Sequence, residues 1–118
     1  MKLGHIELFV IDPLISLHFY EHILGCEVIE VQGKESCVWI KIGEVEILLR
    51  RGNPKVIENE YKDAQSAIVL YTDDLDGEIS TFVARGLRLS GTDGSDREPT
   101  FTDPDGHWFQ IVDPRDFS

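Results

Sequence analysis

The chain consists of short segments in which every second residue is apolar, interrupted by two segments with helical spacing. The first segment, LGHIELFV, predicts a strand over about residues 2–10. Asp12 and Pro13 follow as an N-cap and a first helical residue, and apolar residues then recur at helical spacing until Gly25. The pattern therefore predicts a strand, a tight corner and an amphipathic helix.

Three strand-like runs follow this helix: CEVIEVQ, SCVWIKIG and VEILLR, separated by the turn sequences GKE and GE. The first half of the chain is thus predicted to be βαβββ. The next segment, residues 53–65, has mixed charge and weak periodicity, which is typical of a linker.

The second half repeats this pattern. SAIVLYT predicts a strand, Asp73 and Asp74 a cap, and the apolar stripe that follows a helix ending at Gly86. LRLSG, PTFTD and HWFQIVD predict three further strands, the last two joined by the turn sequence DPDG. One ungapped offset relates the halves and pairs Asp12 with Asp73, Leu14 with Leu75, and Gly25 with Gly86. We expect one domain over residues 1–118, with modules at about 1–52 and 66–118.

Composition narrows the classes of function. A chain of 118 residues has the size of one compact domain, and no apolar run reaches the roughly 18 residues of a membrane span. Eleven Lys and Arg against 22 Asp and Glu give a net charge of -11, which disfavours nucleic acids and anionic membranes as partners. The N-terminus has no export signal, so we expect a cytoplasmic protein in which Cys26 and Cys37 stay reduced.

Three segments, HIELFVIDPLISLHFYEHILGCEV, DDLDGEISTFVARGLRL and FTDPDGHWFQIVD, together resemble the vicinal oxygen chelate superfamily. This superfamily includes glyoxalase I, bleomycin-resistance proteins and extradiol dioxygenases. The resemblance implies an α+β fold in which two tandem βαβββ modules form a cupped mixed sheet with helices on its convex face. It also implies a cavity for a small organic molecule on the other face, and a homodimer.

Strand parity predicts which residues lie on each face. The apolar parity, expected under the helices, comprises Ile6, Leu8, Val10, Val45, Ile47, Leu49, Ile68, Leu70, Phe109 and Ile111. The resemblance assigns the opposite parity to the cavity: His5, Glu7, Phe9, Glu46, Leu48, Arg50, Ala67, Val69, Tyr71, Trp108, Gln110 and Val112. Of these we predict as ligand-binding residues His5, Glu7, Phe9, Leu48, Arg50, Tyr71, Trp108 and Gln110.

Metal-dependent members of the superfamily use four ligands, one on the first and one on the last strand of each module. The resemblance places His5, Glu46 and Gln110 at three of these positions, as candidate ligands for Ni, Zn, Mn or Fe. The remaining position falls on Ala67 or Ser66, neither of which is a plausible ligand. Since the amide of Gln110 brings no charge, the set is weaker than the complete one, and we expect no obligatory metal.

Several of these residues have two interpretations. Glu7 and Glu46 are candidates for acid–base catalysis, or they are solvated carboxylates. Arg50 is an anchor for a carboxylate or phosphate, or a surface arginine. His18 and His22, spaced i and i+4 in HFYEH, are able to clamp a metal, but the segment lacks the HExxH pattern and indicates a solvated helix face. His107 is interpreted as a turn residue.

Three hypotheses for function follow. The first is a protein similar to the bleomycin-resistance branch that binds a small organic molecule without obligatory metal. The second is a metal-dependent lyase, isomerase or dioxygenase that uses His5, Glu46 and Gln110. The third is a dimeric interaction subunit whose cavity is closed by Trp108 and Tyr71. Whether the chain is an enzyme is left open by its sequence.

Overall fold

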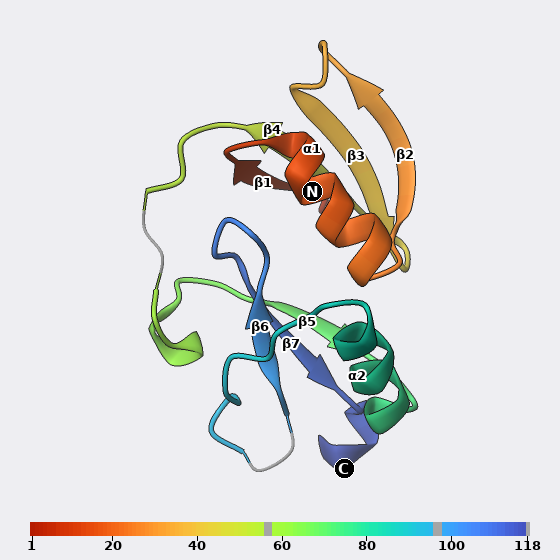
Figure 1. Ribbon diagram of the computed structural model, residues 1–118, viewed down its shortest axis with the longest axis vertical. Helices are drawn as coiled ribbons and strands as arrows, with labels where there is room; N and C mark the ends of the chain where they lie inside the picture. Colours follow the sequence, from red (N-terminus) through yellow and green to blue (C-terminus); the bar gives the residue numbers. More distant parts are fainter. Residues whose placement is uncertain (56–57, 96–97, 118) are drawn as a thin grey trace. The chain divides into compact units, whose positions relative to one another are not determined.

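The computed structural model describes residues 1–55, 58–95 and 98–117, and the chain divides into two compact units, Met1–Lys55 and Val56–Ser118 (Figure 1). The first unit contains β1 (Ile6–Val10), α1 (Pro13–His18), a π-helix (Phe19–Ile23), β2 (Glu27–Gln32), β3 (Cys37–Ile42) and β4 (Val45–Arg51). The second contains a 3-10 helix (Tyr61–Asp63), β5 (Ile68–Tyr71), α2 (Leu75–Ala84), β6 (Thr100–Thr102), β7 (Trp108–Val112) and a 3-10 helix (Pro114–Phe117). No helix in these three described ranges is long and apolar enough to cross a bilayer.

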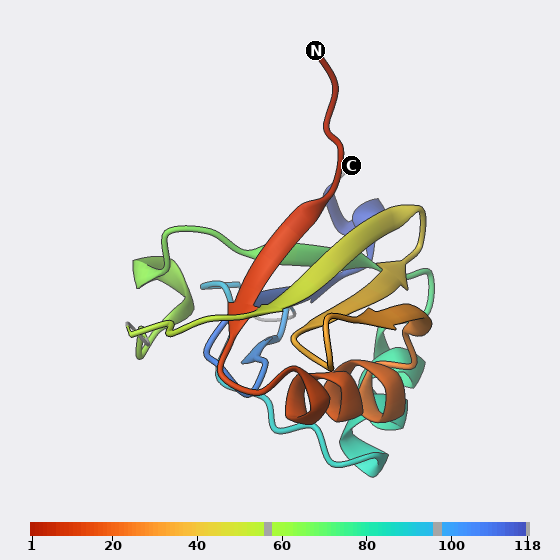
Figure 2. The same cartoon turned by 90° about the horizontal axis from the view of Figure 1, so that it is seen from above.

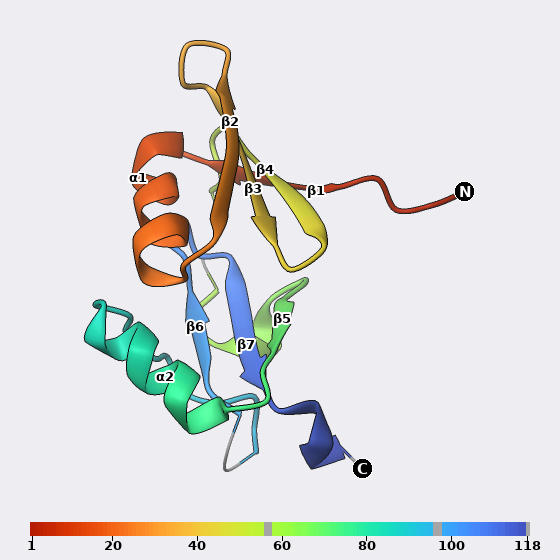
Figure 3. The same ribbon diagram turned by 90° about the vertical axis from the view of Figure 1, so that its right-hand side faces the viewer.

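The first unit is a four-stranded mixed sheet in the order β1-β4-β3-β2, with α1 on one face (Figure 3). β1 runs parallel to β4, and the other neighbours are antiparallel. The predicted apolar face is confirmed on the neighbouring strands β1 and β4, where four of its side chains are at most 9% exposed: Leu8, Val10, Ile47 and Leu49. Burying alternate residues of neighbouring strands under one helix is what fixes the register of this sheet.

The predicted first helix is present, but only its start is α-helical. Asp12 caps it as expected, because its carboxylate accepts a hydrogen bond from the Leu14 amide at 3.0 Å. After His18 the helix widens into the π-helix, in which the Leu24 amide donates to the carbonyl of Phe19 at 3.2 Å. The chain leaves the helix at Gly25, whose φ of 75° is a conformation that favours glycine.

The second unit is a three-stranded mixed sheet in the order β5-β7-β6, with β5 parallel and β6 antiparallel to β7. The predicted strand over LRLSG is wrong: residues 87–91 are described and form no strand. They touch β6 at single points, through hydrogen bonds from Ser90 to the Thr100 carbonyl (2.7 Å) and from Thr100 to the Gly91 carbonyl (3.0 Å). Gly91 has a φ of 81°, which interrupts the extended backbone, and beyond it only an isolated bridge between Thr92 and Pro99 is described.

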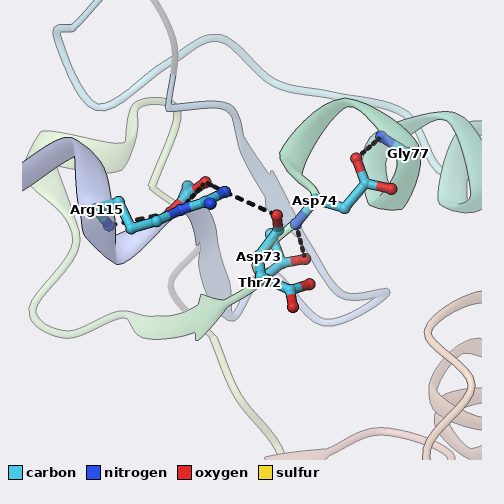
Figure 4. A network of polar contacts seen from close by, with 6 residues as sticks. Thr72, Asp73, Asp74, Gly77 and Arg115 are labelled. Atoms are coloured by element: carbon cyan, nitrogen blue, oxygen red, sulfur yellow. Dashed lines mark hydrogen bonds and ion pairs between the residues drawn. The ribbon is translucent and has the colours of Figure 1, made fainter.

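A polar network fixes the start of α2 (Figure 4). The Asp74 carboxylate accepts the amide of Gly77 at 3.2 Å, which confirms the predicted cap, and the Asp74 amide donates to the hydroxyl of Thr72 at 3.1 Å. From the segment after β7, the Arg115 guanidinium donates to the Asp73 carbonyl at 2.8 Å. The helix start is therefore held both by its own cap and by Arg115 of the 3-10 helix after β7, which is drawn in blue next to the C-terminus in Figure 2.

Replacing Asp74 by Ala is expected to lower the free energy of unfolding by about 1 kcal/mol, because the Gly77 amide loses its acceptor. Urea denaturation followed by circular dichroism measures this change. Asp76→Ala is the matched control, since it removes a carboxylate from the same first turn and leaves the cap in place. Equal losses in the two variants would show that charge at the helix start, and not the cap, is what stabilises it.

Candidate functional site

The face of the first sheet opposite α1 carries four clustered side chains: His5, Glu7, Trp39 and Arg50. We call them the sheet-face cluster. Strand register brings them together, because Leu48 of β4 pairs with Glu7 of β1 on one side and with Trp39 of β3 on the other. Arg50 lies two residues further along β4 and therefore points to the same face. Leu48 itself, between its two neighbours, is only 2% exposed.

Two polar contacts organise the sheet-face cluster around Glu7. One carboxylate oxygen of Glu7 lies 3.0 Å from Nε2 of His5, and the other lies 3.2 Å from Nε of Arg50. The His5 ring contacts the indole of Trp39 edge-on, with ring centroids 4.8 Å apart. Trp39 in turn donates from Nε1 to the side-chain oxygen of Gln32 at 3.1 Å. Glu7, a predicted ligand-binding and acid–base residue, is thus held by a hydrogen bond to His5 and an ion pair with Arg50.

Arg50 combines an ion pair with unused donors. Among the residues that the structure describes, its contact to Glu7 involves Nε, and the two terminal nitrogens have no partner. Its side chain is 48% exposed. Register places it beside Phe9, which is 49% exposed, and opposite Cys37. This part of the face therefore presents the terminal nitrogens of the Arg50 guanidinium next to the ring of Phe9.

In the second unit, Gln110 is fixed by two partners distant in sequence. The hydroxyl of Tyr61 donates to its amide oxygen at 3.0 Å, and its amide nitrogen donates to the carboxylate of Asp93. Burial, together with the negative charge of Asp93, raises the pKa of Tyr61 and so keeps its hydroxyl proton in place. The ring of Tyr61 also meets that of Trp108 edge-on at 6.0 Å. The side-chain oxygen and nitrogen of Gln110 are therefore both hydrogen-bonded within the protein.

The other predicted ligand-binding residues differ in exposure. Trp108 is 5% exposed and Gln110 7%, whereas Tyr71 is 68% exposed. Sequence reasoning missed Trp39 and Tyr61. Trp39 was detectable, because β3 follows the same alternation as β4; Tyr61 lies in the predicted linker, where no periodic pattern assigns a face.

The donor set does not fit the metal site that the superfamily resemblance implies. His5 faces Glu7, and the exposed Glu46 pairs with Lys41 in the ladder between β3 and β4. The oxygen of Gln110 accepts from Tyr61, and the remaining position is Ala67, which has no donor atom. In the described part of the chain, no three His, Cys, Asp or Glu side chains are grouped so as to hold a metal ion. The residues at the four implied positions therefore do not supply the superfamily's complete ligand set.

The model of one protein family, the Glyoxalase/Bleomycin resistance protein/Dioxygenase superfamily, matches residues 2–111. The chain belongs to this superfamily. The match confirms the resemblance inferred from the sequence, and the two mixed sheets with their helices have the glyoxalase fold. No curated protein matches the chain in sequence.

Solved structures of glyoxalase-fold proteins are similar to the chain. The fosfomycin resistance protein FosX from Listeria monocytogenes is 20% identical, with a TM-score of 0.74 and coverage of 96% of this chain and 90% of that one. A lactoylglutathione lyase from Agrobacterium tumefaciens is 17% identical, with a TM-score of 0.72 and coverage of 99% and 96%. A variant of the Listeria protein, 22% identical with a TM-score of 0.74 and coverage of 95% and 91%, was solved with Mn(II) and 1S,2S-dihydroxypropylphosphonic acid. At these identities the likeness shows the fold.

Proposed function

We propose that this glyoxalase-superfamily chain binds a small organic anion on the sheet-face cluster, without an obligatory metal. The observation that carries the proposal is the Arg50 guanidinium, whose two terminal nitrogens have no partner among the described residues, beside the exposed ring of Phe9. A guanidinium binds carboxylate, phosphate or phosphonate groups through two parallel hydrogen bonds. An adjacent aromatic ring provides apolar surface for the body of the same molecule.

The ion pairs of Glu7 support this proposal. Because Glu7 holds Nε of Arg50, the guanidinium plane has a defined orientation before any ligand arrives, which lowers the entropic cost of binding. The phosphonate in the solved structure of the FosX variant is an anion of the class we propose. The charge of -11 belongs to the whole chain, and a local anion site is compatible with it.

Arg50→Gln is expected to weaken binding of phenylphosphonate at least about tenfold, or ~1.4 kcal/mol, because one charged, bidentate contact is lost. Tryptophan fluorescence and calorimetry measure the affinity, since Trp39 belongs to the sheet-face cluster. The matched control is Arg51→Gln: the neighbouring Arg51 donates to the Ile11 carbonyl at 3.1 Å, and we expect this variant to bind like the wild type. Equal weakening in both variants would contradict the proposal.

A second candidate function is a metal-dependent lyase, isomerase or dioxygenase, which would require His5 to release Glu7. The Mn(II) in the FosX variant favours it, as does the pairing of Ile6 in β1 with Ile47 in β4, because His5 and Glu46 are the residues just before this pair. His5→Ala separates the two candidates. Without an obligatory metal, the change in phenylphosphonate affinity that this variant causes is the same with and without added Mn(II). Joint loss of Mn(II) uptake and of ligand affinity in both His5→Ala and Glu46→Ala would establish the metal-dependent function instead.

We also propose that the protein is a homodimer, as the resemblance to the superfamily implies, and that it acts in the cytoplasm. Light scattering after size exclusion measures its mass. A dimer that binds no member of an anion library would favour the third hypothesis, an interaction subunit, over a ligand-binding protein.

A further inference from the structure

Two histidines on the helical side of the first unit lie together, outside the sheet-face cluster. His18 is the last residue of α1, and His22 lies in the π-helix that follows. Their ring centroids are 4.7 Å apart, with the ring planes inclined by 41°. Both side chains are exposed, that of His22 to 61%. Neither imidazole serves the core, so the packing of the fold gives no reason for the pair.

Local backbone structure places the two rings side by side. Residues four apart are neighbours on a helix surface, and the π-helix extends this surface beyond the last turn of α1. π-helical turns occur mostly as short insertions and are frequent at functional sites. Here the insertion is anchored from the opposite side of the helix, where Phe19 and Tyr20 are buried at 7% and 0% exposure. The buried side holds the backbone in place while the two imidazoles remain in solvent.

We propose that His18 and His22 form a binding site for one divalent transition-metal ion, such as Cu²⁺ or Ni²⁺. Imidazole nitrogen is a preferred ligand for these ions, and bond lengths of about 2.0–2.1 Å, as for zinc, allow one ion to bridge rings at this separation. The carboxylate of Glu21 lies 3.4 Å from Nε2 of His22 and supplies compensating negative charge. The net charge of -11 further favours a cation at the surface.

A metal ion bound by these two histidines exchanges with solution and does not hold the fold together. Two imidazoles leave the remaining coordination positions to water, and the described residues contain no group of three or more His, Cys, Asp or Glu side chains that could hold a metal. The proposal is independent of the proposed function, because the histidine pair lies on the helix and the sheet-face cluster on the opposite side of the sheet. Because the histidine pair would bind metal by itself, metal bound to the wild-type chain does not show that a metal lies at His5.

The test is calorimetric titration of Cu²⁺ into the untagged full chain, with His18→Gln and His22→Gln as the two variants. We expect one ion per wild-type chain and at least about tenfold weaker binding in each variant, because one of two ligands is lost. Electron paramagnetic resonance of the Cu²⁺ complex should show coordination by two imidazole nitrogens in the wild type and one in each variant. Circular dichroism verifies that both variants are folded.

His107→Gln is the matched control, since His107 is bound by Asp103 in the second unit, and it is expected to bind Cu²⁺ like the wild type. Wild-type affinity in both helix variants, or no saturable Cu²⁺ binding at all, would overturn the proposal. Loss of the ion in His5→Gln alone would also overturn it, by placing the metal on the sheet face. Phenylphosphonate binding, measured in the same variants, reports separately on the proposed function and should be unaffected by His18→Gln.

Discussion

Phe109→Ala is expected to lower the free energy of unfolding by about 3–5 kcal/mol, because truncating a buried aromatic ring leaves a cavity that the surroundings fill only in part. Phe109, the second residue of β7, is fully buried. It pairs with Ile68 of β5 on one side and Phe101 of β6 on the other. The rings of Phe101 and Phe109 are stacked, with centroids 5.1 Å apart and planes inclined by only 6°. The variant therefore removes the side chain that joins all three strands of the second sheet.

Urea denaturation followed by circular dichroism measures this loss. The matched control is Tyr71→Ala, which truncates another aromatic ring in the same sheet, at the end of β5, where the side chain is 68% exposed. An exposed truncation of this kind changes stability by about 0.5 kcal/mol or less. Comparable losses in the two variants would mean that the stacked pair is not the centre of this core.

The features of the fold that sequence predicted well are local. Side-chain alternation defined β1, β3 and β5, in which more buried residues alternate with more exposed ones. The caps at Asp12 and Asp74 were readable because a short polar side chain binds the amides of the next turn. The turn sequence DPDG was readable for the same reason, since its first carboxylate, Asp103, accepts from the backbone amide of Asp105.

The features that sequence did not predict depend on partners distant in the chain. Gln110 was a candidate metal ligand through the resemblance alone, and the sequence did not show that its amide hydrogen-bonds Tyr61, 49 residues away, and Asp93, 17 residues away. The π-helix after α1 leaves no mark in the apolar spacing, because it changes the hydrogen bonds by one residue while the same face stays buried. The failed strand at LRLSG has β-like alternation, yet the conformation of Gly91 prevents continuous pairing.

His107, interpreted from the sequence as a turn residue, proves to be part of a charged pair. Its Nδ1 lies 2.7 Å from Oδ2 of Asp103, whose side chain has no exposed surface. The other carboxylate oxygen accepts the backbone amides of Asp105 and His107, both at 2.9 Å. Asp103 thus closes the DPDG turn through three contacts. The spacing of Asp103 and His107, four residues apart across a tight turn, could have indicated this contact. Nothing in the sequence showed that Asp103 is buried.

The pair makes stability depend on pH. Burial of the ring lowers the pKa of His107, but the hydrogen bond to Asp103 and the charges of Asp103 and Asp105 outweigh burial and raise this pKa above its usual value. In the unfolded chain the histidine has a pKa of about 6.5. The stabilisation from protonated His107 is therefore complete below about pH 6.5 and is lost as the pH rises through the higher pKa of the folded state.

Asp103→Asn is expected to cost about 1.5–3 kcal/mol at about pH 6, where a hydrogen bond to a charged partner is lost. The cost becomes smaller as the pH is raised toward about 8.5, because His107 loses its proton as the pH passes through its raised pKa. Urea denaturation of wild type and variant over this range gives the difference in the free energy of unfolding at each pH. Taking the difference cancels the titration of the other histidines, which both proteins share. His107→Gln removes the titrating ring and keeps the carboxylate. Its loss in free energy of unfolding relative to the wild type should likewise be smaller at high pH than at low pH. A deficit that stays constant or grows with rising pH would mean that Asp103 acts only through the backbone amides of its turn.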